Sequence, residues 1–329
     1  MYEASLINGT CFTCKPDTSI LDSANASGIT LQHSCKTGQC GVCASKVLDG
    51  NTKILKAEIA LSSEQIINGW ILTCCREAIS DVALDTEDLP DLSELVVKTW
   101  PARIDSIEHL TKSILRVILR TPPSNSLHFL AGQYVSVIGP NGLRRSYSIA
   151  NAPRNDGKIE LHIKRVAGGA FSEYWFEQAN ANDLLRFEGP LGTFFVRKPL
   201  PRKLLLLATG TGLAPIKAIL ENIASLPGNE QPEIELYWGS RHAEDVYLDP
   251  SLIMCSSLKV HLLLSQPAEA WAGRKGYVQN AVLEDHSNFD DCAVYACGSI
   301  KMIESAKAAL IQSGLPSNKF HSDAFVSSN

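Results

Sequence analysis

Four cysteines have the type and spacing needed to hold an iron–sulfur cluster. Cys35, Cys40 and Cys43 form C-x4-C-x2-C within HSCKTGQCGVC, and Cys74 follows later in ILTCC. This is the spacing of plant-type 2Fe–2S ligands, which are thiolates. Two glycines inside the first run would let the loop backbone turn close to the inorganic core. The pattern therefore predicts a 2Fe–2S site and one-electron chemistry.

A disulfide framework or a zinc site could also use thiols of this kind. Ten cysteines in 329 residues are too few for a disulfide scaffold, and the start MYEASLINGT lacks the basic and apolar regions of a secretory signal. A zinc site would favour two well-placed C-x2-C pairs. Only one well-placed pair exists here. Cys11 and Cys14 form a separate C-x2-C, but they lie on an expected hairpin without a second pair, and we interpret them as structural.

Composition and charge favour a multidomain globular protein. The chain has 329 residues, 45% of them hydrophobic and 20% charged, which suggests two or three domains. Its longest apolar run, 204–208, is far too short to cross a bilayer. The net charge of −5 argues against a general nucleic-acid binder. We therefore expect a cytoplasmic protein, in a compartment where thiols stay reduced, with no membrane and no nucleic-acid partner.

Three regions with different patterns must position the reactive residues. Residues 1–91 alternate short β-like runs with a capped helix expected over 17–28, and Asn8-Gly9 favours a tight hairpin turn. A polar, acidic stretch follows, and we place a linker over 92–100. Residues 101–199 contain many β-rich runs and one helical insert over 172–179, which indicates a small antiparallel barrel.

The last region, 200–329, alternates strands and helices. This alternation predicts an open, mainly parallel α/β sheet. The charge balance also differs between the three regions. Residues 1–91 carry 6 basic and 12 acidic side chains, residues 92–199 carry 14 basic and 9 acidic ones, and residues 200–329 carry 10 basic and 14 acidic ones. A basic middle region suits a domain that holds phosphates and faces an acidic neighbour, although scattered surface charge would give the same numbers.

A glycine-rich turn in the last region could bind a dinucleotide. The run 210–212 (Gly-Thr-Gly) follows the apolar stretch LLLLA and precedes the predicted helix APIKAILENIA. A helix N-terminus offers unpaired N–H groups to a pyrophosphate. Such turns are common, so the motif alone is weak, but Cys297-Gly298 follows another strand of the expected sheet. Both would lie at the carboxyl ends of strands, where open α/β sheets bind ligands.

The middle region carries two further anion-binding candidates. Arg145, in RSYS, can pair with phosphate because of its planar guanidinium group. Farther on, a basic strand end leads through two glycines to Ser172, which we expect to start a helix whose N-terminus could bind an anion. A barrel strand could carry the RSYS residues for packing alone. Lone histidines such as His33, His162 and His261 are interpreted as core or surface residues.

In its ordered motifs the chain resembles the ferredoxin–NADP reductase superfamily with an N-terminal plant-type ferredoxin domain. The motifs are the cluster cysteines, R-x-Y-S, G-x-x-S, G-x-G-x-x-P, C-G and a C-terminal aromatic residue, and together they cover essentially the whole length. The resemblance implies a multidomain α+β and α/β fold. It consists of a β-grasp ferredoxin domain over 1–91, a linker over 92–100, an antiparallel FAD-binding barrel over 101–199 and an NAD-binding domain over 200–329.

The resemblance also implies roles for individual residues. Arg145 would meet the flavin phosphates, Tyr147 would pack on the isoalloxazine ring, and Ser148 would approach its N5 atom. Aligning on LTC makes Cys74 the fourth cluster ligand and leaves Cys75 without an assigned role. The other implied cofactor contacts are Gly169 and Ser172 (flavin pyrophosphate), Gly210, Thr211, Gly212 and Pro215 (dinucleotide), Cys297 and Gly298 (nicotinamide), and Phe325 (flavin ring). Ser148 and Cys297 are the expected catalytic positions, Cys297 as an orienting contact rather than a nucleophile.

The implied activity is electron transfer from NADH through FAD and a 2Fe–2S cluster to a partner protein. Arg241 could meet the 2′-phosphate of NADPH, but no basic cluster surrounds it in the sequence, so we expect NADH. The stretches ILTCC, RRSYSIANAP, GPLGTFFVR, VYACGS and FHSDAFV are similar to reductases that serve a PMP-dependent iron–sulfur sugar dehydrase. That pair removes the C3 hydroxyl of CDP-4-keto-6-deoxyglucose in making 3,6-dideoxyhexoses of bacterial surface polysaccharides.

Two alternatives remain open at this point. One is the reductase component of a multicomponent aromatic-ring oxygenase or monooxygenase, which would share the domains and differ in its acceptor. The other is a ferredoxin-like carrier or redox sensor without its own catalysis, which would leave the flavin and nucleotide motifs without a role.

Overall fold

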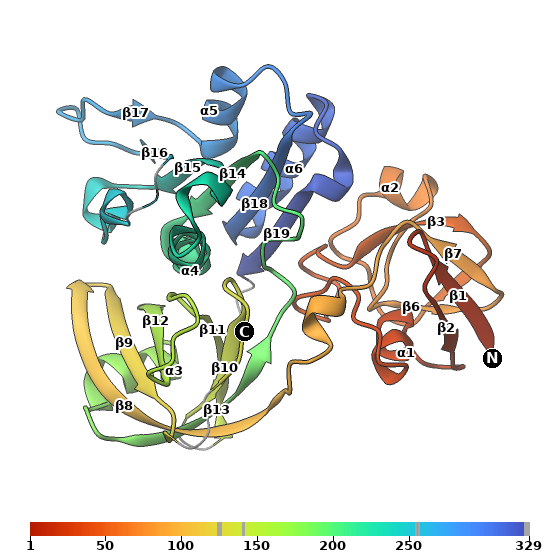
Figure 1. Ribbon diagram of the computed structural model, residues 1–329, viewed down its shortest axis with the longest axis horizontal. Helices are drawn as coiled ribbons and strands as arrows, with labels where there is room; N and C mark the ends of the chain where they lie inside the picture. Colours follow the sequence, from red (N-terminus) through yellow and green to blue (C-terminus); the bar gives the residue numbers. More distant parts are fainter. Residues whose placement is uncertain (124–126, 140–141, 254, 256, 326–329) are drawn as a thin grey trace. The chain divides into compact units, whose positions relative to one another are not determined.

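The computed structural model describes residues 1–123, 127–139, 142–253, 255 and 257–325 (Figure 1). Contacts divide the chain into two compact units. The first contains residues 1–95 together with 323–325, and the second is Val96–Ser322. The division at Leu95 lies inside the expected linker.

The N-terminal unit is built on a mixed sheet with strand order β2-β1-β7-β3-β5. Its first two strands form the expected hairpin, in which Gly9 adopts φ 85°. The strands and helices are β1 (Tyr2–Leu6), β2 (Cys11–Cys14), α1 (Ile20–Ala26), β3 (Ala44–Asp49), β4 (Thr52–Ile54), α2 (Ser63–Ile67), β5 (Trp70–Leu72), β6 (Arg76–Ala78) and β7 (Val82–Leu84). Helix α1 begins where the Ser19 hydroxyl accepts from the backbone N–H of Asp22 at 3.1 Å. Its buried Ile20 and Leu21 belong to the core of this unit.

The first part of the second unit is the expected antiparallel barrel. Its strand order is β11-β10-β13-β8-β9-β12, and a bridge between Ile149 and Leu161 links the two ends of the sheet. The strands are β8 (Lys98–Thr111), β9 (Ile114–Arg120), β10 (Tyr134–Ile138), β11 (Arg144–Ser148), β12 (Lys158–Lys164) and β13 (Leu184–Leu191). Strand β8 begins inside the expected linker.

One local expectation for the barrel is wrong. The helical insert begins earlier than expected, with α3 (Ala170–Glu173) capped at Gly169 and followed by a π-helical turn over Tyr174–Gln178. Ser172 therefore lies inside the helix. Its hydroxyl accepts from the backbone N–H of Val166 at 2.9 Å, which ties the helix to the strand end before it.

The remaining strands form an open α/β sheet in the order β17-β16-β15-β14-β18-β19. Strand β14 pairs in parallel with both β15 and β18, as the strand–helix alternation predicts. The elements are β14 (Lys203–Thr209), α4 (Leu213–Ala224), β15 (Glu233–Ser240), β16 (Leu258–Leu264), β17 (Arg274–Lys275), α5 (Val278–Asp285), β18 (Cys292–Ser299), α6 (Ile300–Gln312) and β19 (Phe320–Phe325). In Figure 1, α4 lies between this sheet and the barrel strands.

An apolar core continues from this sheet into the barrel. The buried cluster around β14, β15 and α4 also contains Ile114, Ala131 and Phe194, which come from the barrel region. The predicted fold class, with a ferredoxin-type unit, a barrel and an α/β sheet, is confirmed. Among the described residues, no helix has both the length and the apolar character required to cross a bilayer.

Candidate redox and nucleotide sites

The four predicted cluster cysteines form two thiol pairs in the N-terminal unit. The sulfur atoms of Cys43 and Cys74 lie 3.3 Å apart, and the thiols of Cys35 and Cys40 hydrogen-bond with each other. Within the described residues, no three potential metal ligands converge on a single ion position. Two pairs, rather than one converging set, suit a cluster in which each of two irons takes two thiolates. The donor set therefore fits a 2Fe–2S cluster.

Within each pair, the hydrogen bond between the two thiols favours the thiolate form of one of them. The bond with Cys40 lowers the pKa of Cys35 to about 4, and the backbone N–H of Thr37 also points at this sulfur at 3.4 Å. The bond with Cys43 lowers the pKa of Cys74 to about 6. The pKa values of Cys40 and Cys43 rise, with the bonds to Cys35 and Cys74 as the largest cause. One sulfur of each pair thus holds the proton that cluster binding would displace.

Cys75 occupies a different environment from Cys74. It is fully buried, and burial raises the pKa of its thiol to about 12. Its sulfur donates a weak hydrogen bond to the carbonyl of Ala57 at 3.6 Å and lies beneath Gly38, whose missing Cβ would come within 2.9 Å of it. Gly38 has φ +78° and would also meet the Ala57 carbonyl at 2.3 Å. Cys75 is therefore a small protonated residue that lets the cluster loop approach the segment below it.

A buried ion pair beside the cysteines was missed by the sequence analysis. Glu58 accepts from the backbone N–H of Leu72 at 2.7 Å and from both Nε and Nη2 of Arg76, at 2.9 and 2.7 Å. The pair joins the segment that covers the cluster loop to both sides of Cys74. Because Glu58 and Arg76 are far apart in the sequence and carry no motif, only the tertiary fold reveals the pair.

The RSYS residues occupy strand β11, at the edge of the barrel sheet. The Arg145 guanidinium group donates to the carbonyl of Arg144 at 2.8 Å, and the neighbouring Arg144 is paired with Glu188. No ion pair with a carboxylate is seen for Arg145 among the described residues, so its charge is available for a phosphate. Ser148, the last residue of the strand, is buried.

Tyr147 is held by aromatic neighbours. Its hydroxyl accepts from the indole N–H of Trp175 at 3.2 Å, and its ring lies 6.0 Å from that of Phe171. Burial raises the pKa of Tyr147 beyond its usual range, so the phenol stays neutral. Phe171 follows Gly169 in α3, which brings two motifs that are separate in the sequence to one end of the barrel.

The glycine-rich turn and the Cys-Gly dipeptide are brought together as predicted from strand ends. Ala208 of β14 and Cys297 of β18 are direct neighbours across the parallel pair. A Cβ on Gly212 would come within 2.2 Å of the Cys297 carbonyl, so the two backbones are in contact there. A Cβ on Gly298 would likewise meet the Thr209 hydroxyl oxygen at 2.1 Å. This close approach is the physical reason for glycine at both positions.

The turn leads directly into α4, as the sequence predicts. Gly210 to Gly212 form a single 3-10 turn, and Pro215 lies in the first turn of α4, where it is tolerated. Cys297 is fully buried, and Phe325 is the partly exposed last residue of β19.

A pocket at the same edge of the sheet was not predicted. It has a volume of about 430 Å³, within the range of small-molecule sites, and lies beyond the carboxyl ends of β15 and β16. It is lined by His242, Ala243, Glu244, Leu264, Ala268, Ala270 and Trp271. Nearby, at the end of β15, the buried hydroxyl of Ser240 has no hydrogen-bond partner among the described residues. At this edge the sequence indicates only Arg241, as a candidate contact for the 2′-phosphate of NADPH.

Comparisons with known proteins identify the family of this chain and its three domains. Three family models match consecutive parts of the chain: a 2Fe-2S iron-sulfur cluster binding domain at 6–78, an oxidoreductase FAD-binding domain at 101–196 and an oxidoreductase NAD-binding domain at 206–308. The CDP-6-deoxy-L-threo-D-glycero-4-hexulose-3-dehydrase reductase of Yersinia pestis is 42% identical over 98% of this chain and 97% of its own length. The chain belongs to the family of iron–sulfur flavoprotein reductases.

Other relatives of this reductase serve different acceptors. Terephthalate 1,2-dioxygenase reductase component 1 of Comamonas sp is 33% identical, covering 96% of this chain and 95% of the relative. A solved structure, the ferredoxin reductase in carbazole 1,9a-dioxygenase, has a TM-score of 0.70 and 29% identity, and the match covers 99% and 98% of the two chains. The reductase is thus an NAD(P)H-dependent oxidoreductase that uses NADH, FAD and a 2Fe–2S cluster and passes electrons to a partner protein.

Proposed function

We propose that this reductase delivers electrons from NADH to a PMP-dependent iron–sulfur dehydrase that removes the C3 hydroxyl of CDP-4-keto-6-deoxyglucose. The observation that carries the proposal is the 42% identity, over nearly the whole of both chains, to a reductase named for a CDP-hexulose 3-dehydrase. A second relative, protein RfbI of Salmonella typhimurium, is 37% identical over 97% of this chain. The pathway would be 3,6-dideoxyhexose biosynthesis for lipopolysaccharide O-antigen, in the cytoplasm, where the ten free thiols stay reduced.

The proposed domain boundaries are those expected from the sequence: ferredoxin domain 1–91, linker 92–100, FAD-binding domain 101–199 and NAD-binding domain 200–329. They are supported by the division of the chain at Leu95 and by the positions of the three family matches.

The proposed cluster roles are supported by the two thiol pairs, and the proposed flavin roles are those that the family resemblance implies. Cys35 and Cys40 would hold one iron, and Cys43 and Cys74 the other, with Cys75 outside the ligand set. Bound FAD accepts the electron pair of a nicotinamide hydride and passes electrons on singly. Arg145 would bind the flavin phosphates, Tyr147 would pack on the ring and Ser148 would approach its reactive edge. Gly169 and Ser172 would line the pyrophosphate, and Phe325 would cover the ring.

On the nucleotide side, the backbone of the 210–212 turn would bind the NADH pyrophosphate. Thr211, Pro215 and Gly298 would complete the contour of that site, and the buried Cys297 would orient the nicotinamide. Glu244, in the pocket beyond β15, favours NADH because its carboxylate would repel the 2′-phosphate of NADPH.

The test compares two acceptors with the purified holo reductase. We expect NADH oxidation coupled to loss of the sugar C3 hydroxyl when a PMP-dependent CDP-hexulose dehydrase is supplied. We expect no coupled turnover with the terminal component of an aromatic-ring dioxygenase, the second candidate, which the Comamonas relative supports. Coupling to the dioxygenase alone would overturn the sugar assignment and leave electron transfer from NADH intact.

A further inference from the structure

We propose that a buried polar clamp positions the NADH-binding turn against the flavin motif in this reductase. The clamp consists of Glu160 and His162 in β12, Lys217 and Glu221 in α4, and Tyr247 in the segment after β15. The inference rests on the NADH-to-FAD path of the proposed function. It assigns positioning roles to residues that belong to none of the sequence motifs.

One arm of the clamp joins α4 to the segment just after the flavin motif. The Lys217 ammonium donates to the carbonyl of Ala150 at 3.0 Å, and the Glu221 carboxylate accepts from the backbone N–H of Ala152 at 3.0 Å. Lys217 and Glu221 also pair with each other at 2.6 Å. Ala150 and Ala152 follow Ser148 closely, while α4 begins directly after the 210–212 turn. A single rigid helix therefore links the two cofactor-binding segments.

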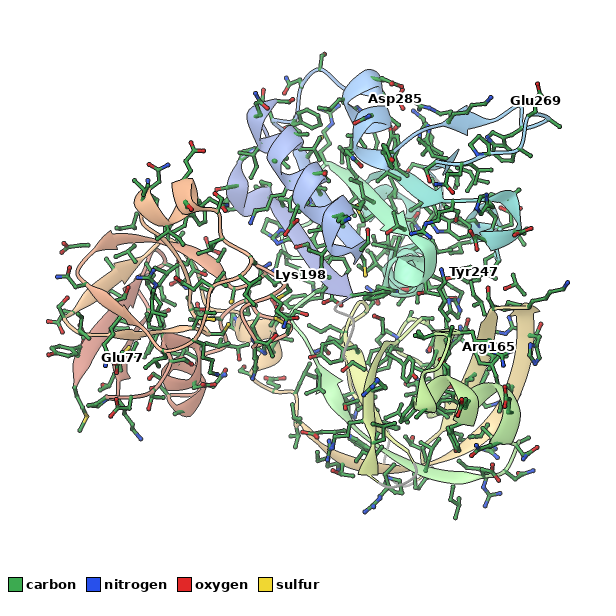
Figure 2. All side chains as sticks on the ribbon, turned by 180° about the vertical axis from the view of Figure 1, so that it is seen from behind. Glu77, Arg165, Lys198, Tyr247, Glu269 and Asp285 are labelled. Carbon is green, nitrogen blue, oxygen red and sulfur yellow. The ribbon has the colours of Figure 1, made fainter. Side chains whose placement is uncertain are left out.

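The other arm joins β12 to Tyr247. His162 Nδ1 lies 3.0 Å from the Tyr247 hydroxyl, and its Nε2 lies 2.8 Å from a carboxylate oxygen of Glu160. All three residues are buried, and Figure 2 shows Tyr247 where the α/β sheet meets the barrel. The arms are joined because Lys217 also contacts the second Glu160 oxygen at 3.3 Å.

The protonation states of Glu160, His162 and Tyr247 fix which atom donates in each hydrogen bond of the second arm. Burial raises the pKa of Glu160, but His162 and Lys217 more than offset this and leave it below the usual value, so Glu160 can only accept. Burial lowers the pKa of His162 despite the nearby carboxylate, so the ring is neutral. Its one N–H must then be on Nε2 and donate to Glu160, and Nδ1 must accept from Tyr247. Burial also keeps the Tyr247 phenol protonated by raising its pKa.

Tyr247 connects the second arm of the clamp to the 210–212 turn through Trp238. Its ring meets the Trp238 indole edge-on at a centroid distance of 5.4 Å, and the indole N–H donates to the Gly210 carbonyl at 3.0 Å. The Cys297 thiol is also close enough to contribute to the raised pKa of Tyr247. The clamp thus runs from the barrel to both halves of the predicted nicotinamide-binding edge.

Directional bonds matter here because much of the remaining contact between barrel and sheet is apolar. The shared core around Ile114, Ala131 and Phe194 holds the barrel and sheet together but is non-directional. Hydrogen bonds have preferred distances and angles, so they can set the relative orientation of the two surfaces. Hydride transfer needs that orientation, since misplacement of reacting groups by about 1 Å can cost on the order of a hundredfold in rate.

The test uses Tyr247→Phe and Lys217→Met, with Tyr237→Phe as a matched control. Tyr237 is a buried tyrosine within β15, and its hydroxyl lies 3.1 Å from a Glu235 oxygen and 2.9 Å from an Asp285 oxygen. It precedes Trp238 in β15, so its side chain lies on the opposite face, away from the clamp. Each tyrosine variant removes one hydroxyl and keeps the ring.

Two readouts are measured on the full-length holo protein. Anaerobic stopped-flow absorbance gives the limiting rate of flavin reduction by NADH and the apparent Kd. Amide hydrogen exchange reports local opening at 150–154 and 210–213. We expect Tyr247→Phe and Lys217→Met to slow flavin reduction about tenfold with little change in Kd, and to accelerate exchange in both segments. Lys217→Arg should restore part of the flavin-reduction rate and part of the protection from exchange. Tyr237→Phe should change neither the rate nor the exchange.

Unchanged flavin reduction and exchange in Tyr247→Phe and Lys217→Met would overturn the clamp, as would an equal effect of Tyr237→Phe. If NADH failed to reduce the flavin of the unmodified protein, the proposed function would fall instead. The exchange pattern would then still decide whether the clamp exists.

Discussion

Two adjacent cysteines show how environment separates residues of identical chemistry. Both are buried, but Cys74 lies 3.3 Å from the Cys43 sulfur and has a lowered pKa, whereas Cys75, 3.5 Å from the Cys74 sulfur, has a raised pKa and donates to a carbonyl. A cluster ligand must be a thiolate, so these differences favour Cys74. They also give Cys75 a packing role beneath the loop glycine.

The first prediction concerns this pair. Cys74→Ser should abolish the visible absorbance and electron paramagnetic resonance signal of the reduced 2Fe–2S cluster while the flavin absorbance remains. Cys75→Ser should retain the cluster, because its thiol stays protonated, donates to the Ala57 carbonyl and lies beside the ligand Cys74 at 3.5 Å rather than replacing it. A stable cluster in Cys74→Ser together with its loss in Cys75→Ser would reverse the ligand assignment.

At the scale of elements, the cysteine loop depends on the segment that covers it. A Cβ on Gly41 would lie 3.3 Å from the side chain of Ala60, and the Ala60 N–H donates to the Gly38 carbonyl at 3.0 Å. Glu58 lies in the same segment, and its bonds to Leu72 and Arg76 attach it to the chain on both sides of Cys74.

The second prediction tests that attachment. Arg76→Ala should lower the free energy of unfolding of the ferredoxin unit by about 3 kcal/mol, because it leaves the Glu58 carboxylate buried and without its ionic partner. Arg76→Ala should also increase the rate at which an iron chelator removes the cluster. A urea titration measures the stability, and the visible absorbance of the cluster measures its loss.

Lys53→Ala removes an exposed lysine from the buried Glu77, which keeps its hydrogen bond from the Asp17 N–H, so it should cost less stability. It should leave the rate of cluster loss unchanged, because that pair takes no part in the bonds of Glu58 to Leu72 and Arg76. Equal behaviour of the two variants would contradict the proposed attachment.

At the scale of the whole molecule, buried histidines contribute to the response of stability to pH. Burial is the largest cause of the lowered pKa of His33, His162, His286 and His321. His321 is the most affected, with a pKa of about 3; its ring stacks on Tyr295, and its Nδ1 has no hydrogen-bond partner among the described residues. Below about pH 6.5 the unfolded chain binds protons that these folded histidines do not, so acidification favours unfolding.

The third prediction isolates His321 from the other groups. His321→Phe keeps an aromatic ring against Tyr295 and removes the titration. The variant should gain stability over the unmodified protein as pH falls from about 6.5 toward 4, by up to about 1.4 kcal/mol per pH unit. Denaturant titrations at each pH, followed by circular dichroism, measure the difference. Burial raises the pKa of Asp323 to about 6, which acts in the opposite direction but is common to both proteins. A pH-independent difference would show that His321 titrates normally.

The sequence alone determined the features that depend on local pattern. Cysteine spacing predicted the cluster donors, hydrophobic periodicity predicted the barrel and the parallel sheet, and the positions of 210–212 and Cys297-Gly298 after strands predicted that they would meet. The barrel, the parallel sheet and the meeting of the strand ends are confirmed, because strand ends and glycine turns are set by short-range stereochemistry. The cluster donors remain a prediction.

Only the tertiary structure decided the features made by residues that are distant in the chain. The start of α3 moved to Ala170, and His162, interpreted from the sequence as a core or surface residue, became a link to Tyr247 through a bond spanning 85 positions. The Glu58–Arg76 pair and the Lys217–Ala150 contact have no sequence signature either. A polar group that is removed from water needs a hydrogen-bond partner, and the fold determines which groups lie within hydrogen-bond distance of it.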